Sequence, residues 1–164
     1  MSKTATKAVG NVFYQARKAA ATWNDRLSSR EGASEETGVD RTRLANIELN
    51  TINPHPEEVL MLSEVYHAPE LCNHFCSRMC PLGIHTVNEV EIGELEKNVL
   101  QLLAAFQSLP QVKAELIDIA ADGVIDSAEK PRMENILKRL DEAATKIQAL
   151  KIYFQKQCGN SHLE

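Results

Sequence analysis

Apolar side chains recur every three or four residues along most of the chain, which is the spacing of amphipathic α-helices. In the first half this pattern predicts helices over about residues 11–23, 29–37, 40–49 and 57–66, and a further helix after Ala68. Pro54 and Pro56 interrupt the pattern, and Pro56 suits the first turn of a new helix. The Pro/Gly stretch from Cys80 to Gly83 predicts a domain boundary. We therefore expect an all-α N-terminal domain of five helices over residues 11–83.

From Asn88 the apolar spacing becomes a regular alternation of three and four, which is typical of helices packed at a shallow angle. It predicts a helical hairpin or three-helix domain over residues 88–158, with a short helix over 111–122 and a last helix over about 127–157. At 1.5 Å per residue the last helix would span roughly 45 Å. So long a seam indicates a partner, so we expect a homodimer, although an intramolecular three-helix bundle would also satisfy the spacing. The seam comprises Ile92, Leu95, Val99, Leu102 and Phe106, then Met133, Ile136, Leu140, Ala143, Ile147, Leu150 and Phe154.

The segment from Gly38 to Asn50 reads as a tight turn followed by a short helix. Gly38 supplies the permissive backbone of the turn, and Asp40 is a good N-cap. Leu44 and Ile47 fall on one face of the predicted helix. The other face carries side chains that donate to phosphates and base edges, namely Arg41, Thr42, Arg43 and Asn46.

This segment, GVDRTRLANIELN, resembles the helix-turn-helix of the Cro/repressor-type (Xre-like) regulators. Their pattern is roughly Gly-Val-Ser, three polar residues, Ile, two polar residues, Ile-Glu, one residue and Gly. Asn50 replaces the closing Gly, and Ala33 and Thr37 stand where Leu is usual. The resemblance covers about residues 11–76. The residues that match are Val39, Leu44, Ile47 and Glu48.

The resemblance implies a lambda-repressor-like fold and a sequence-specific transcriptional regulator of phage or mobile-element kind, most simply a repressor. Residues 40–49 would enter the major groove of double-stranded DNA, and a dimer would read half-sites about one helical turn apart. Arg17 and Glu48 would form a structural ion pair; a solvated arginine is the alternative. The implied base-reading residues are Arg41, Thr42 and Asn46, and the implied phosphate contacts are Ser29, Arg30 and Arg43. The unit also occurs as a protein-interaction module, in antitoxins or accessory subunits.

The distribution of charged residues limits how this chain could bind DNA. The chain has 164 residues and a net charge of −5, yet residues 1–49 carry 8 basic and 6 acidic side chains. A small basic surface on an acidic protein favours weak non-specific binding, so affinity would rest on a specific site and on dimerisation. Residues 1–10 are expected to be a flexible arm, which could instead contact DNA through Lys3 and Lys7, and residues 159–164 a tail. We expect no membrane span, no signal peptide and a cytoplasmic protein with reduced thiols.

Two clusters have weaker chemical patterns. Cys72, Cys76 and Cys80, with His67, His74 and His85 nearby, offer zinc-ligand atoms, but their spacing fits no standard zinc pattern, and core packing explains the thiols.

Residues 118–129 partly match a calcium loop, although position 3 is Ala120. A helix end at Gly123 and a capping box from Asp126 to Glu129 explain the same residues. The sequence has no nucleophile elbow, phosphate-cradling glycine loop or HExxH pair, so we expect neither enzyme activity nor a cofactor.

Overall fold

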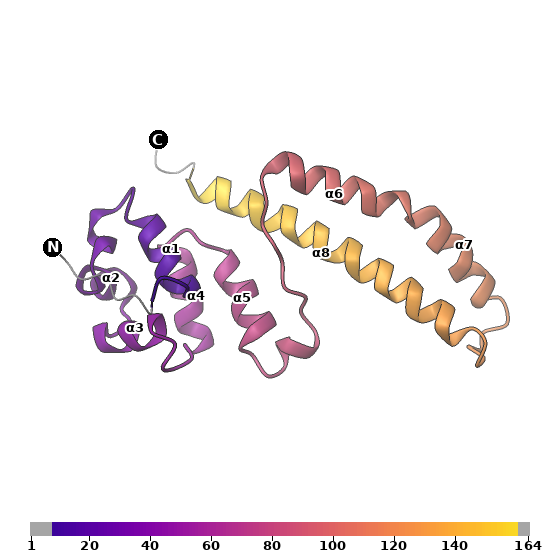
Figure 1. Cartoon of the computed structure of the whole chain (residues 1–164), viewed down its shortest axis with the longest axis horizontal. Helices are drawn as coiled ribbons and strands as arrows, with labels where there is room; N and C mark the ends of the chain where they lie inside the picture. The colour runs from indigo at the N-terminus through magenta and orange to yellow at the C-terminus, as the bar shows by residue number, and fades with distance from the viewer. Residues whose placement is uncertain (1–7, 161–164) are drawn as a thin grey trace. The chain divides into compact units, whose positions relative to one another are not determined.

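The computed structural model describes residues 8–160, and these residues form helices and turns without a strand (Figure 1). The chain divides into two compact units. Unit 1 contains the described residues up to Val87 together with those from Lys156, and unit 2 contains Asn88–Gln155. The elements of unit 1 are α1 (Val12–Ala20), the 3₁₀ turn η1 (Asp25–Ser28), α2 (Arg30–Thr37), α3 (Arg41–Glu48), α4 (Pro56–Val65), α5 (Glu70–Arg78) and the 3₁₀ turn η2 (Gly83–His85).

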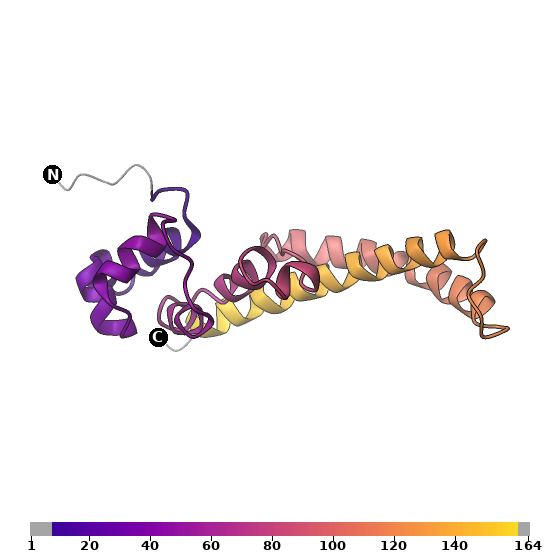
Figure 2. The same cartoon turned by 90° about the horizontal axis from the view of Figure 1, so that it is seen from below.

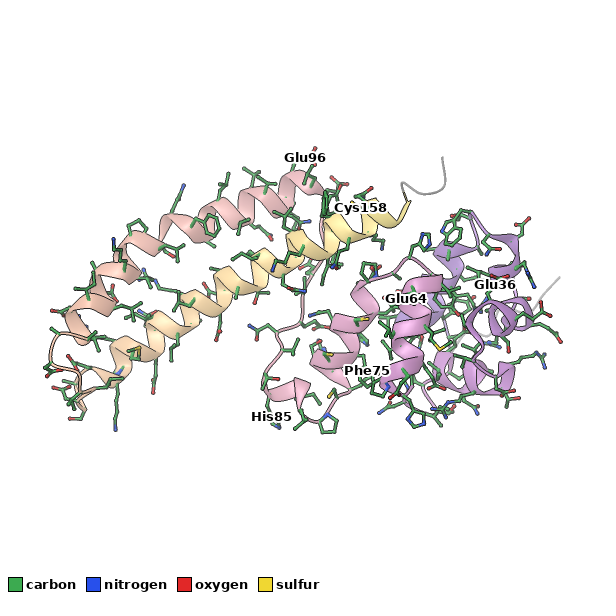
Figure 3. All side chains as sticks on the ribbon, turned by 180° about the vertical axis from the view of Figure 1, so that it is seen from behind. Glu36, Glu64, Phe75, His85, Glu96 and Cys158 are labelled. Carbon is green, nitrogen blue, oxygen red and sulfur yellow. The ribbon has the colours of Figure 1, made fainter. Side chains whose placement is uncertain are left out.

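The core of unit 1 draws on every helix from α1 to α5. Helix α1 packs on α3, α2 packs on both α3 and α4, and α4 packs on α5. Phe75 of α5, labelled in Figure 3, is among the buried side chains. Burial of such side chains contributes roughly 1.5–3 kcal/mol each before the entropy cost of ordering them. The core residues are Phe13, Ala20, Leu27, Ala33, Val39, Leu44, Ile47, Val59, Leu62, Tyr66, Ala68, Leu71 and Phe75.

Side chains at the helix starts explain where α1 to α4 begin. Asn11 caps α1 by accepting from the Tyr14 N–H at 2.9 Å, and Ser29 caps α2 by accepting from the Gly32 N–H at 3.0 Å. Asp40 caps α3 by accepting from the N–H groups of Thr42 and Arg43. Pro56 opens α4, where a missing N–H costs nothing. These caps occupy donors that a helix cannot satisfy internally.

Some predicted boundaries differ from the structure. The first helix ends at Ala20 rather than near Trp23, because residues 21–23 form a turn that leads into η1. Residues 8–10, expected in the flexible arm, form a turn in which Ala8 is fully buried. The last helix continues to Asn160, two residues into the expected tail. Residues 1–7 of the arm and 161–164 of the tail lie outside the described residues.

Unit 2 is a helical hairpin. Helices α6 (Leu95–Gln107) and α7 (Leu109–Ile119) run antiparallel to the long helix α8 (Lys130–Asn160), which is unbroken in both views (Figures 1 and 2). Pro110 stands in the first turn of α7, which therefore begins as a new helix after α6. Arg132 pairs with Asp118 at 2.6 Å, and Arg139 lies 3.6 Å from Glu115. These contacts fix which turns of α7 and α8 face one another.

The predicted seam of unit 2 is only partly covered. Ile136 and Ala143 of α8 are buried, and Val112, Ile119 and Ile136 form a small core. Other seam residues remain open to solvent. Their exposed fractions are 44% for Leu95, 40% for Phe106, 36% for Leu140, 37% for Ile147 and 66% for Phe154. The described chain therefore does not close this seam on itself, as the intramolecular three-helix bundle would require.

The connection between α7 and α8 is longer than the sequence suggested, because α7 ends at Ile119, before Gly123, and α8 begins at Lys130, after Asp126. Gly123 has a φ of +75°. The Asp126 carboxylate accepts from the N–H groups of Ala128 and Glu129, and the Glu129 carboxylate accepts from the Asp126 N–H at 3.1 Å. This reciprocal pair is a capping box. Within the described part of the chain, no helix has both the length and the apolar character needed to cross a membrane.

Candidate functional site

The turn between α2 and α3 depends on a glycine. Gly38 has a φ of +71°, in the left-handed region that other residues enter at a cost, and its N–H donates to the Ser34 carbonyl at 2.9 Å. Thr37 is buried, and its hydroxyl donates to the Ala33 carbonyl and accepts from the Val39 N–H. The turn therefore keeps its buried polar groups paired while it reverses the chain between the two helices.

A buried ion network fixes α3 against α1 and α2. Arg17 of α1 and Glu48 of α3 are 3% and 1% exposed, and they pair bidentately, with Nε to Oε1 at 2.5 Å and Nη2 to Oε2 at 3.0 Å. The structure thus brings together the two residues expected to pair. Arg30 of α2 adds a second cation, with Nε 2.7 Å from Glu48 Oε2. Burial alone lowers the pKa of Arg17, but the hydrogen bonds and charge of Glu48 outweigh it, so the pKa is raised.

Asn11 also joins α1 to the end of α3, a role that could not be predicted from the sequence. Its Nδ2 donates to the Ile47 carbonyl and to Asn50 Oδ1, both at 2.8 Å. Asn50 has a φ of +57°, in the left-handed region that asparagine enters more readily than most residues other than glycine. Together, Asn11 and the ion network hold both the side and the end of α3.

The outer face of α3 carries the residues proposed from the sequence to read bases. Arg41 and Thr42 are exposed in the first turn, and Asn46 is half-buried one turn later. Thr42 and Asn46 are four residues apart and so share a face. The side chain of Arg41 is 66% exposed, with its Nε 3.8 Å from the Glu31 carboxylate of α2. The arrangement presents a guanidinium, a hydroxyl and an amide from one rigid helix.

Arg43, which the sequence predicts to contact phosphate, pairs with a carboxylate on α4. Its Nε and Nη2 donate to the two carboxylate oxygens of Glu58 on α4, the latter at 2.9 Å. Glu58 also accepts from the His55 N–H at 2.6 Å. Burial by itself raises the pKa of Glu58, but the bonds from Arg43 and His55 outweigh it and lower the pKa. The guanidinium therefore links α3 to α4 in the free protein, a role that sequence spacing did not indicate.

The other two expected phosphate contacts also have local partners. Ser29 is exposed, and its hydroxyl caps α2. Arg30 is 28% exposed and is held by Glu48. The N-terminus of α2 points N–H groups outward, as at any helix start, and this is a general feature of phosphate sites. Each of these two side chains therefore already makes a contact within the folded protein.

Helix α2 carries three acidic side chains, of which Glu31 lies beside Arg41. Glu31, Glu35 and Glu36 lie along α2 (Glu36 is labelled in Figure 3), and Arg26 pairs with Glu35 at 2.5 Å and with Glu36 at 2.8 Å. Residues 8–87 hold 7 Arg and Lys against 10 Asp and Glu. Acidic side chains therefore outnumber basic ones in this part of the chain.

No protein-family model, curated protein or solved structure matches this chain.

The cysteine cluster is part of the unit 1 core. Cys72, Cys76 and Cys80 are half-buried free thiols packed against that core, and burial, with the neighbouring thiols adding to it, raises the pKa of Cys76. His67 stacks on Trp23 with ring centroids 4.6 Å apart. Among residues 8–160 no three His, Cys, Asp or Glu side chains are grouped to hold a metal ion. The thiols pack in the manner of small apolar side chains.

Proposed function

We propose that this chain is a sequence-specific DNA-binding transcriptional regulator, most simply a repressor, which reads the major groove with α3. The observation that carries the proposal is the outer face of α3, where Arg41, Thr42 and Asn46 project from a helix held by buried polar contacts. Arg41 can fork onto guanine, and Asn46 can pair bidentately with adenine. A rigid helix that presents such side chains suits base readout, because the entropy cost of ordering the helix is met when the protein folds and not when it binds DNA.

Phosphate binding in this proposal comes mainly from main-chain donors. The first N–H groups of α2, next to Ser29, would hold one phosphate, aided by the helix dipole. Arg30 and Arg43 keep 28% and 30% of their side chains exposed, so each would reach a phosphate while remaining beside its carboxylate. With few free cations, non-specific affinity would be low, and specific contacts would dominate.

The acidic row on α2 favours a second candidate, a protein-interaction module. Glu31, Glu35 and Glu36 would repel phosphates but would suit a basic protein surface. Under this alternative the helix-turn-helix unit would bind a partner protein and would not read DNA.

Enrichment of random duplex DNA on the purified full chain at low salt tests the proposal. DNA reading predicts an enriched motif whose affinity falls steeply with salt, because phosphate contacts release counterions. An unenriched pool, together with binding to basic proteins, would favour the interaction module. Glu31→Gln separates the two further, since it should tighten DNA binding and weaken binding of a basic partner.

A further inference from the structure

Helix α8 carries two separate apolar rows. The inner row, Ile136, Ala143 and Leu150, is buried or half-buried, and Ile136 packs against Val112 and Ile119 of α7; Ala149 and Ile152 near the end of the helix are also buried. The outer row runs beside the inner row, displaced around the helix axis. Most of its side chains are open to solvent, with Leu137 52% exposed and Phe154 66% exposed. Its spacing is 3, 4, 3, 4, 3 and 4, a heptad pattern over nearly the whole helix. The outer row is Leu137, Leu140, Ala144, Ile147, Lys151, Phe154 and Cys158.

Helix α6 extends the same uncovered face. Its inner residues Asn98 and Ala105 are buried or half-buried, whereas Leu103 and Phe106, displaced round the helix in the same sense as the outer row of α8, are 53% and 40% exposed. In neighbouring antiparallel helices, rotation of the same sense from the contact line leads to the same side of the pair. Leu103 and Phe106 therefore lie on the same face of the hairpin as the outer row of α8. Figure 3 shows side chains projecting from both helices along their length.

The size of this face matches a protein interface. The open parts of its large apolar side chains amount to on the order of 600 Å², close to the roughly 800 Å² that each partner buries in a stable complex. A hairpin has only two layers of helix, so one face of each helix lacks a neighbour. A second hairpin would convert the pair into a four-helix bundle.

The charges on α8 favour a second copy in antiparallel orientation. If two α8 helices paired in parallel and in register, Lys151 of the outer row would meet Lys151 of the partner. In an antiparallel pair centred near Thr145, Lys151 lies opposite Leu140. The same register places Leu137 opposite Phe154 and the small Ala144 opposite Ile147. The two copies of Lys151 are then kept apart, and each apolar side chain of the row, apart from Leu140 opposite Lys151, meets another apolar side chain.

We propose that the outer row of α8, with Leu103 and Phe106 of α6, is a homodimer interface at which two α8 helices pack antiparallel, Leu137 of each against Phe154 of the other. The interface forms without DNA. Its test is therefore independent of whether α3 reads bases.

Disulfide trapping of the full chain tests the orientation. In a Cys158→Ser background, Leu137→Cys combined with Phe154→Cys should give oxidised dimers, whereas each single substitution should not, because residues at position 137 lie roughly 25 Å apart along an antiparallel pair. The Cys158→Ser parent and both single variants retain Cys72, Cys76 and Cys80, so any disulfide formed by those thiols would appear in these controls as well. Trapping through Cys158 in the wild-type chain, without trapping of the double variant, would establish a parallel dimer and overturn the proposal.

Sedimentation equilibrium tests the face itself. Ala144→Glu keeps a good helix former but places a carboxylate in the interface, so the dimer dissociation constant should rise at least about tenfold with helicity unchanged. Leu82→Glu is the matched control, because Leu82 is 80% exposed and lies outside unit 2. An unchanged dissociation constant for Ala144→Glu, or a wild-type chain that is monomeric at tens of micromolar, would refute the interface.

Discussion

Glu48 connects more of the N-terminal unit than any neighbouring side chain of α3. It is 1% exposed and accepts from two guanidinium groups, those of Arg17 and Arg30, which belong to two other helices. A buried carboxylate in such a network is costly to desolvate, but removal of one partner is costlier, because it leaves a buried charge unpaired. The network therefore locks the orientation of α3 rather than adding large net stability.

Glu48→Ala should lower the free energy of unfolding by about 3–5 kcal/mol, since Arg17 would remain buried without its carboxylate. The measurement is urea unfolding followed by fluorescence of Trp23, the sole tryptophan, which lies in unit 1. Glu35→Ala is the matched control: it removes an equally close but exposed pair with Arg26 and should cost less than about 1 kcal/mol. Equal costs for the two variants would show that the network does not anchor α3.

Stability should also depend on pH through Glu58. Its pKa is lowered in the folded protein, so the stability it contributes is fully present above the ordinary pKa of 4.5 and is lost as the pH falls through the lower, folded value. The difference in urea midpoint between wild type and Glu58→Gln should therefore shrink as the pH is lowered below 4.5. A difference that stays constant down to pH 3 would exclude an ionised Glu58 held by Arg43.

Residue roles could be predicted only where a motif fixed both partners. The family resemblance named Arg17 and Glu48, and the two side chains lie in contact. Arg30 and Arg43 were assigned to phosphates, yet each pairs with a carboxylate, Glu48 and Glu58 respectively. Sequence distance does not say which of many acidic residues a long flexible side chain will reach. That choice depends on how α3 packs against α2 and α4.

At the scale of elements, close approach of backbones determines how α2 is placed. A Cβ at Gly32 would lie 2.1 Å from the carbonyl oxygen of Arg26, so only glycine lets α2 pack on η1. Capping residues and prolines predicted the helix starts well, because their signals are local. Packing between α2 and η1 has no local signal, and neither the short turn η1 nor the need for Gly32 could be predicted from the sequence.

Gly32→Ala should destabilise unit 1 by at least about 2 kcal/mol, because a backbone carbonyl cannot move aside as a flexible side chain can. The readout is again the urea midpoint by Trp23 fluorescence. Gly10→Ala serves as the control, since nothing lies within 4 Å of a Cβ there and its effect should be within about 0.5 kcal/mol. Similar midpoints for both variants would mean that α2 and η1 are not in such close contact.

At the scale of the whole molecule, the two units differ in how completely they bury apolar surface. Unit 1 has a core drawn from five helices, whereas the core of unit 2 consists of Val112, Ile119 and Ile136 with few neighbours. Heptad spacing predicted a hairpin with a long last helix. It could not show how the apolar residues divide between an inner and an outer row, because that depends on the position of α6 and α7.

If unit 2 forms the dimer, the Tm of unit 2, but not that of unit 1, should depend on protein concentration. Dimer formation stabilises by mass action, so the Tm of the helical signal outside unit 1 should rise with concentration, while the Trp23 transition stays constant. Circular dichroism and fluorescence at concentrations a hundredfold apart provide the comparison. Ala144→Glu should remove the concentration dependence, and a wild-type Tm that is independent of concentration would contradict a dimer.

Base reading by α3 is tested by comparing two selections of random duplex DNA, one on the wild-type chain and one on Asn46→Ala. If α3 reads base pairs, the wild-type chain enriches a motif. Asn46→Ala then loses preference at one position of that motif, with a cost of about 1–3 kcal/mol, while Trp23 fluorescence shows an unchanged fold. No enriched motif for wild type, or the same motif and affinity for both proteins, would contradict base reading by α3.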